Sequence, residues 1–175
     1  MKKLHVILTL VAVLLFSAGA CSNDGCLDNK SSLPKASFYS SATGKNITLS
    51  RMMISGVGAP GDSVLVGPDQ SVSELYLPMR STQSSTSWCF SYKSEGLDFE
   101  ELNDTVTFDY ETQPYFVSDE CGAIFRYLIT RSSNTTHLID SVVVVDSLIT
   151  NVDMVRIKIF FRTAEEPENP EEPQE

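Results

Sequence analysis

Apolar and polar residues alternate with a period of two along several short stretches of this chain. In DTVTFDYET the apolar positions are Val106, Phe108 and Tyr110, and polar residues stand between them. The stretches TSWCFSY and DMVRIKIFF repeat the same alternation. Since successive side chains of a strand point to opposite faces of a sheet, this pattern predicts half-buried β-strands, and no stretch of the folded part shows a long 3.6-residue period.

Further strands are predicted in KASFYSS, NITLSRMMI, SVLVG and ELYLPM, with turn-forming glycine, proline and asparagine residues between them. The stretches CGAIFRYLIT and SVVVVDSL are apolar on both faces, so we expect them at the centre of a sheet. About eight to ten short strands at this spacing predict an all-β fold, an antiparallel β-sandwich over residues 35–163. An immunoglobulin-like topology is one candidate, although the Cys–Trp–Cys spacing of immunoglobulin domains is absent.

The N-terminus has the order of a bacterial export signal. Lysines occupy positions 2 and 3, and an apolar run follows over residues 4–16. That run is shorter than the roughly 20 residues of a membrane span. Ala18-Gly19-Ala20-Cys21 resembles a lipobox, which predicts a signal peptide over residues 1–20 and fatty acyl chains on Cys21. The alternative is an ordinary signal cleaved after Ala20.

The two ends of the mature chain are predicted to lie outside the folded domain. Residues 21–34 are polar and rich in turn formers, which indicates a lipidated tether. Residues 164–175 carry six Glu and three Pro and are predicted to be a disordered tail. We therefore expect an outer-membrane protein held by its lipid, on the periplasmic or the cell-surface face. The net charge of −10 excludes nucleic acid as the natural partner.

Three cysteines remain once Cys21 carries lipid, so one disulfide and one free thiol are expected. Cys121 shares a strand face with Ala123, Phe125, Tyr127 and Ile129 and is predicted to point inward. Cys89 falls on the serine face of its strand. The pairing that alternation favours is Cys26 with Cys121, which fits an oxidising compartment and would attach the tether to the domain.

No group of residues in the sequence points to catalysis, a cofactor or a metal. His137 is the one histidine outside the signal, and a pair with Cys89 lacks any motif, so a strand-edge histidine is the better interpretation. The acidic stretch LDFEELND offers calcium-type oxygen ligands but lacks EF-hand spacing, and a solvated loop is favoured. We expect a protein that is not an enzyme and that holds no cofactor.

Four tripeptides have the order Asp, hydroxyl residue, aliphatic residue. They resemble the O-glycosylation motif of Bacteroidota, although the same order is typical of a strand leaving a turn. The candidate acceptor residues are Ser63, Thr105, Ser141 and Ser147.

Several strings together resemble a family of small Bacteroidota lipoproteins known only as a domain of unknown function. These strings are ELYLPM, YFVSDECGAIFRYLI, HLIDSVVVVDSLIT and IKIFF, and the resemblance extends over about residues 26–162. It implies no activity, and it agrees with Cys26 and Cys121 as the paired thiols.

The expected partners are the membrane, through the lipid anchor, and an unknown envelope protein or glycan. A glycan-binding lipoprotein should line one face with aromatic residues, for which Tyr76 and Trp88 are the candidates. A fimbrial or assembly subunit would instead pair an edge strand with its partner.

Overall fold

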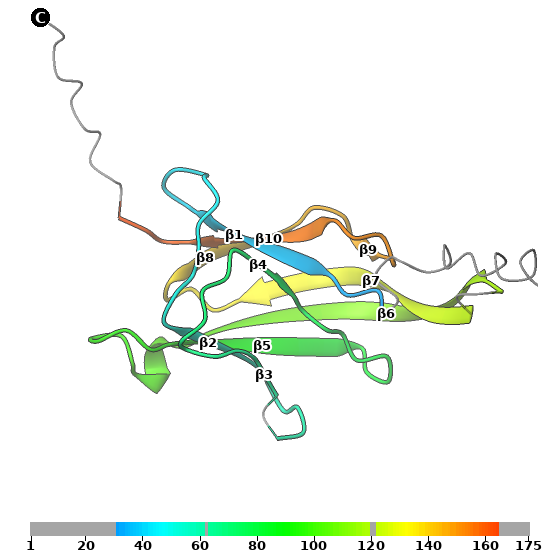
Figure 1. The fold of residues 1–175 in the computed structure, drawn as a ribbon, viewed down its shortest axis with the longest axis horizontal. Coiled ribbons are helices and arrows are strands. Elements are labelled where there is room, and N and C mark those ends of the chain that lie inside the picture. Colours follow the sequence, from blue (N-terminus) through cyan, green and yellow to red (C-terminus); the bar gives the residue numbers. More distant parts are fainter. Residues whose placement is uncertain (1–30, 62, 120–121, 165–175) are drawn as a thin grey trace, which may run out of the picture.

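Ten β-strands and one short 3-10 helix form the regular structure of residues 31–61, 63–119 and 122–164, the parts that the computed structural model describes (Figure 1). Their bounds are β1 Lys35–Ser40, β2 Met52–Gly56, β3 Val64–Val66, β4 Glu74–Tyr76, β5 Ser85–Tyr92, η2 Glu100–Leu102, β6 Asp104–Ser118, β7 Gly122–Asn134, β8 Ile139–Val144, β9 Leu148–Ile149 and β10 Val155–Phe161.

The strands form two sheets that pack face to face. One sheet has the order β4-β1-β10-β8 and the other the order β3-β2-β5-β6-β7-β9. Rings from both sheets meet in the core, where Phe90 of β5 lies 6.2 Å from Phe161 of β10 between ring centroids. The predicted all-β sandwich is confirmed, and its strand pairs are antiparallel except for β1 and β10, which run parallel.

The predicted alternation is confirmed where strands cross the core. Val106, Phe108 and Tyr110 of β6 are buried. Trp88 and Phe90 of the neighbouring strand β5 are also buried, and Trp88 lies directly opposite Val106. Burying these large side chains contributes about 1.5–3 kcal/mol each and is what holds the two sheets together.

Two predictions about the apolar segments are wrong. The segment SVVVVDSL does not lie at a sheet centre, because β8 is an edge strand. Ala123 and Phe125 of β7 share the strand face of Tyr127 and Ile129 but are exposed, whereas Tyr127 and Ile129 are buried as expected. The reason is length: β6 and β7 have 15 and 13 residues, against eight in β5, so their hairpin extends past the sandwich (Figure 1).

The signal peptide, most of the tether and the acidic tail were predicted for residues 1–20, 21–34 and 164–175. Residues 1–30 and 165–175 lie outside the described residues. Among those that are described, no helix is long and apolar enough to cross a membrane.

Candidate functional site

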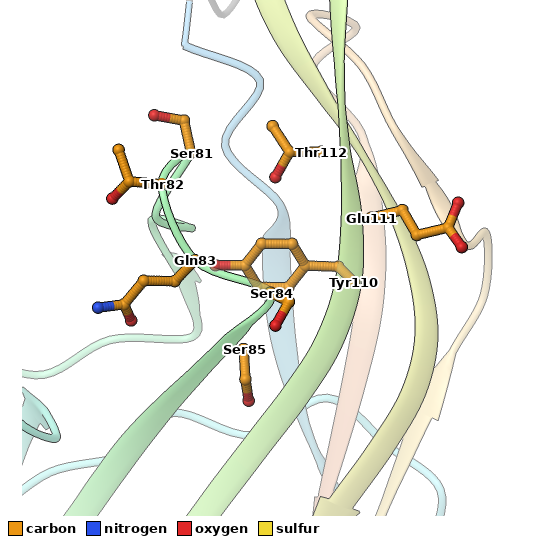
Figure 2. A pocket seen from close by; sticks show the side chains of 8 residues that line it. All are labelled: Ser81, Thr82, Gln83, Ser84, Ser85, Tyr110, Glu111 and Thr112. Atoms are coloured by element: carbon orange, nitrogen blue, oxygen red, sulfur yellow. The ribbon is translucent and has the colours of Figure 1, made fainter.

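An open groove lies where the connection from β4 to β5 passes the middle of β6. At this point Tyr110 donates its backbone N–H to the carbonyl of Ser84, 2.9 Å away, just beyond the last β5–β6 residue pair. Figure 2 shows the residues that line it: Ser81, Thr82, Gln83, Ser84, Ser85, Tyr110, Glu111 and Thr112. The lining is rich in hydroxyl groups, with one amide and one carboxylate.

Tyr110 fixes the shape of this groove. Its ring is buried, and its hydroxyl points toward the connection that precedes β5 (Figure 2). The hydroxyl donates to the carbonyl of Arg80 and accepts from the N–H of the same residue, both at 3.0 Å. Thr86 adds a hydroxyl contact at 2.7 Å. Because all these bonds are internal, Tyr110 positions the loop rather than offering a free group to a ligand.

The groups left free in the groove are suited to binding a polar molecule. Thr82, Gln83 and Ser84 are exposed along the loop, and Glu111 is exposed on β6. Hydroxyls and amides can both donate and accept hydrogen bonds, as recognition of a hydroxyl-rich ligand requires. The one aromatic ring that lines the groove is buried, so the groove offers no stacking surface to a sugar.

Asp104 is the most constrained charged residue in the described part of the domain. It has no exposed surface, and its carboxylate accepts five hydrogen bonds from two hydroxyls and three backbone amides. The donors are Tyr92 Oη at 2.6 Å, Thr135 Oγ1 at 2.7 Å, His137 N at 2.9 Å, Leu138 N at 2.7 Å and Ile139 N at 2.8 Å. The amides belong to the entrance of β8, so Asp104 joins the two sheets.

The electrostatics of this cluster follow from its hydrogen bonds. Burial by itself would raise the pKa of Asp104, but the donors around the carboxylate outweigh it and lower that pKa below its ordinary value. Burial, followed by the bond to Asp104, raises the pKa of Tyr92 well above its ordinary value. The carboxylate is therefore ionised and the phenol neutral near pH 7, as a structural hydrogen-bond centre requires.

His137 and Cys89 each lie within hydrogen-bonding distance of other groups and are not paired with one another. His137 Nδ1 lies 3.1 Å from the carbonyl of Asn103 and 3.4 Å from Asp104 Oδ1. Cys89, a free thiol on β5, has its Sγ 3.5 Å from Ser91 Oγ. This agrees with the interpretation of His137 as a strand-edge residue.

The acidic stretch LDFEELND does not gather its carboxylates. Asp98 pairs with Lys93 at 2.6 Å, Glu100 and Glu101 are exposed on η2, and Asp104 turns into the core. Over the described ranges, no group of three His, Cys, Asp or Glu side chains is placed to hold a metal.

The four candidate glycosylation residues differ in exposure. Ser63 and Ser147 are exposed, and Ser63 Oγ donates to the carbonyl of Pro60 at 3.2 Å. Thr105 and Ser141 are half-buried within β6 and β8. Exposure favours the first two as acceptors, and the remaining sites are less accessible to a transferase.

The aromatic candidates for a glycan surface are not free. Trp88 is only 5% exposed and packs in the core, so its ring is not available to a glycan. Tyr76 donates its hydroxyl to Asp153 at 2.8 Å and lies beside the Lys35 ammonium. Cys21, Cys26 and Cys121 lie outside the described residues, so the lipid site and the disulfide stay predictions.

The sequence analysis missed an exposed apolar surface at the end of the β6–β7 hairpin. Register pairs Pro114 with Phe125 and Phe116 with Ala123, and all four side chains are exposed. We call these four residues the hairpin face. Phe116 and Phe125 are 60% and 45% exposed. The sequence does contain a signal for this surface, because the period-two pattern of β6 continues without a turn beyond the length of the neighbouring strands.

Comparison with known proteins gives one match. No curated protein and no solved structure is similar to the chain. A family model, the family of unknown function DUF6452, matches residues 51–161. The match is shorter than the predicted resemblance and excludes both β1 and Cys26. It contains β2 to β10, and because it covers more than half of the sequence, the chain belongs to the DUF6452 family.

Proposed function

We propose that this protein is an outer-membrane lipoprotein of Bacteroidota whose β-sandwich is a binding or structural module and not an enzyme. The anchor would be a lipid on Cys21, as the sequence Ala18-Gly19-Ala20-Cys21 indicates. The observation that carries the binding role is the β6–β7 hairpin, which extends past the core and exposes Phe116 and Phe125. Exposed apolar surface of this kind is typical of an interaction site.

The roles of the titratable residues support binding over catalysis. Asp104 joins the sheets, His137 bonds to the backbone, and Tyr110 positions a loop. These groups stabilise the fold. The groove beside Tyr110 would then serve recognition, through hydroxyl and amide groups that need no unusual ionisation.

A second candidate is an assembly or fimbrial subunit that adds a strand to its partner. The supporting observation is the edge of β7. Its pairing with β9 is limited to Tyr127 and Leu128, so within the described residues the stretch from Ala123 to Arg126 has a partner strand on one side only. On β6 the corresponding stretch contains Pro114, which has no N–H to donate to an added strand, so this edge is less suited to strand pairing. Glycan binding has less support, because Trp88 is buried.

Labelling with a radioactive fatty acid tests the anchor. The unsubstituted chain should incorporate label and partition with the outer membrane, and Cys21→Ser should lose both. Cys26→Ser is the matched control and should keep both. Persistent labelling of Cys21→Ser would refute the lipoprotein assignment.

Size measurement tests the assembly role on the soluble Cys21→Ser chain. A subunit that pairs through the β7 edge should form chains, and a charge introduced by Phe125→Lys should prevent them. A stable monomer at all concentrations would leave the first candidate, a binding module for a different molecule.

A further inference from the structure

Strand β8 leaves one edge of the four-stranded sheet unpaired among the described residues. The other strands that end a sheet are short, with three residues in β3 and in β4 and two in β9, whereas β8 has six. Native proteins protect sheet edges by short strands, proline, lysine or an inward-pointing charge. Residues 141–145 read SVVVV and have none of these features. β8 is therefore a sheet edge on which a further strand can form hydrogen bonds.

The free edge of β8 presents the backbone groups of two valines. Val145 donates its N–H to the carbonyl of Arg156, which follows Val155 on the neighbouring strand β10, at 2.8 Å. Because the backbone groups of successive strand residues point to opposite sides, the N–H and C=O groups of Val142 and Val144 point away from β10. The side chains of both valines pack against the core, which holds the strand in place. Two donors and two acceptors are therefore directed outward at a fixed spacing.

The sequence around Val143 is nearly the same in both directions. A valine stands on each side of it, and Asp140 and Asp146 lie three positions away. A twofold symmetric dimer needs a surface that is complementary to itself. When the twofold axis passes beside Val143, Val142 lies opposite the partner's Val144, and each such pair exchanges two hydrogen bonds. Val143 then faces its own copy at about 4.5 Å between Cα atoms, the closer type of pair in an antiparallel ladder.

The charges at the two ends of this stretch are compatible with a second copy. In the symmetric register Asp140 lies across from the partner's Asp146, but each carboxylate already has an arginine of its own chain. Arg162 Nη2 lies 3.3 Å from Asp140 Oδ1, and Arg156 Nη1 pairs with Asp146 Oδ2. Each end of the ladder then brings together two carboxylates and two guanidinium groups. The net charge of −10 opposes association, but at physiological ionic strength it is screened over about 8 Å.

We propose that two copies of this chain pair their β8 strands as an antiparallel ladder, which joins their four-stranded sheets into one continuous sheet. Val143 and Val145, which are 45% and 51% exposed in one chain, gain neighbours across the ladder. The hairpin face belongs to the other sheet, so the inference does not depend on the proposed function. The dimer carries two hairpin faces and can hold a partner with two matching sites more tightly than one chain can.

Sedimentation equilibrium of the soluble Cys21→Ser chain tests the dimer. Between about 1 μM and 1 mM protein, the average mass should rise from that of one chain to that of two and then stay constant. Val143→Lys should raise the dissociation constant at least about tenfold, because two ammonium groups then face each other at the axis. Val64→Lys is the matched control. Val64 is a 54% exposed valine on β3, the edge strand of the other sheet, and its substitution should leave the dimer intact.

A mixture of Val143→Lys and Val143→Glu should form dimers again, because opposite charges then meet at the axis, whereas neither variant alone should do so. Unchanged Trp88 fluorescence would verify that each variant is folded. The mass of one chain at every concentration would overturn the proposal, and so would dimers that persist in Val143→Lys. Growth beyond two chains that Phe125→Lys alone suppresses would assign association to the β7 edge and also overturn it.

Discussion

Replacing Asp104 with asparagine should strongly destabilise the domain. The carboxylate is fully buried, and five donors converge on its two oxygens. Asparagine has the same shape but keeps only one oxygen. Its NH₂ group would face N–H donors of the backbone, which cannot reorient as a hydroxyl can. The backbone N–H of His137 on Oδ1 is one of these, and those of Leu138 and Ile139 on Oδ2 are the others.

The expected loss follows from the bonds removed. In either orientation of the amide, its NH₂ group replaces the oxygen that accepts from at least one backbone N–H. The remaining hydrogen bonds are then made to a neutral amide oxygen and not to a carboxylate. A hydrogen bond to a charged group contributes about 1.5–3 kcal/mol. Losing the equivalent of two such bonds gives a destabilisation of about 3–6 kcal/mol, a large part of the about 5–15 kcal/mol that stabilises a typical domain.

Urea unfolding followed by the fluorescence of Trp88 measures this change, because Trp88 is the one tryptophan and is buried in the core. Asp109→Asn is the matched control on the same strand. Asp109 is half-buried, and its substitution should change stability by less than about 0.5 kcal/mol. A loss below about 1 kcal/mol for Asp104→Asn would contradict the role of this carboxylate as the joint between the sheets.

The remaining predictions concern acid stability, the groove, the cysteines and the surface hydroxyls. Because the pKa of Asp104 is lowered in the folded chain, its stabilising effect is complete above the unfolded value of 3.8 and is lost as pH falls through the folded pKa. The unfolding free energy should therefore fall less steeply with pH below about pH 4 in Asp104→Asn than in the unsubstituted chain. Tyr110→Phe should cost about 1–3 kcal/mol in thermal unfolding and speed proteolysis of the connection before β5. Peptide mapping without reductant should join Cys26 to Cys121, and a bridge to any other cysteine would contradict this pairing. Ser63→Ala should reduce carbohydrate staining, and staining of unchanged intensity would exclude Ser63 as an acceptor.

The sequence by itself determined the class of the fold and the buried faces of its central strands. Val106, Phe108 and Tyr110 are buried as their alternation predicts, because a period of two leaves a strand only one way to hide its apolar side chains. Periodicity acts within one strand, so it needs no knowledge of the partners. The predicted export signal is local in the same sense, since its prediction depends on adjacent residues.

The tertiary structure decided which strands are neighbours and where burial ends. Ala123 and Phe125 continue the pattern of Tyr127 yet are exposed, because the hairpin outruns the opposite sheet. The role of Asp104 also depends on a distant partner. The residues that donate to it from the entrance of β8 follow 33 to 35 positions later, and only packing of the two sheets brings them to the carboxylate. Alternation records the environment of a single strand, whereas these features depend on the relative lengths and placement of several.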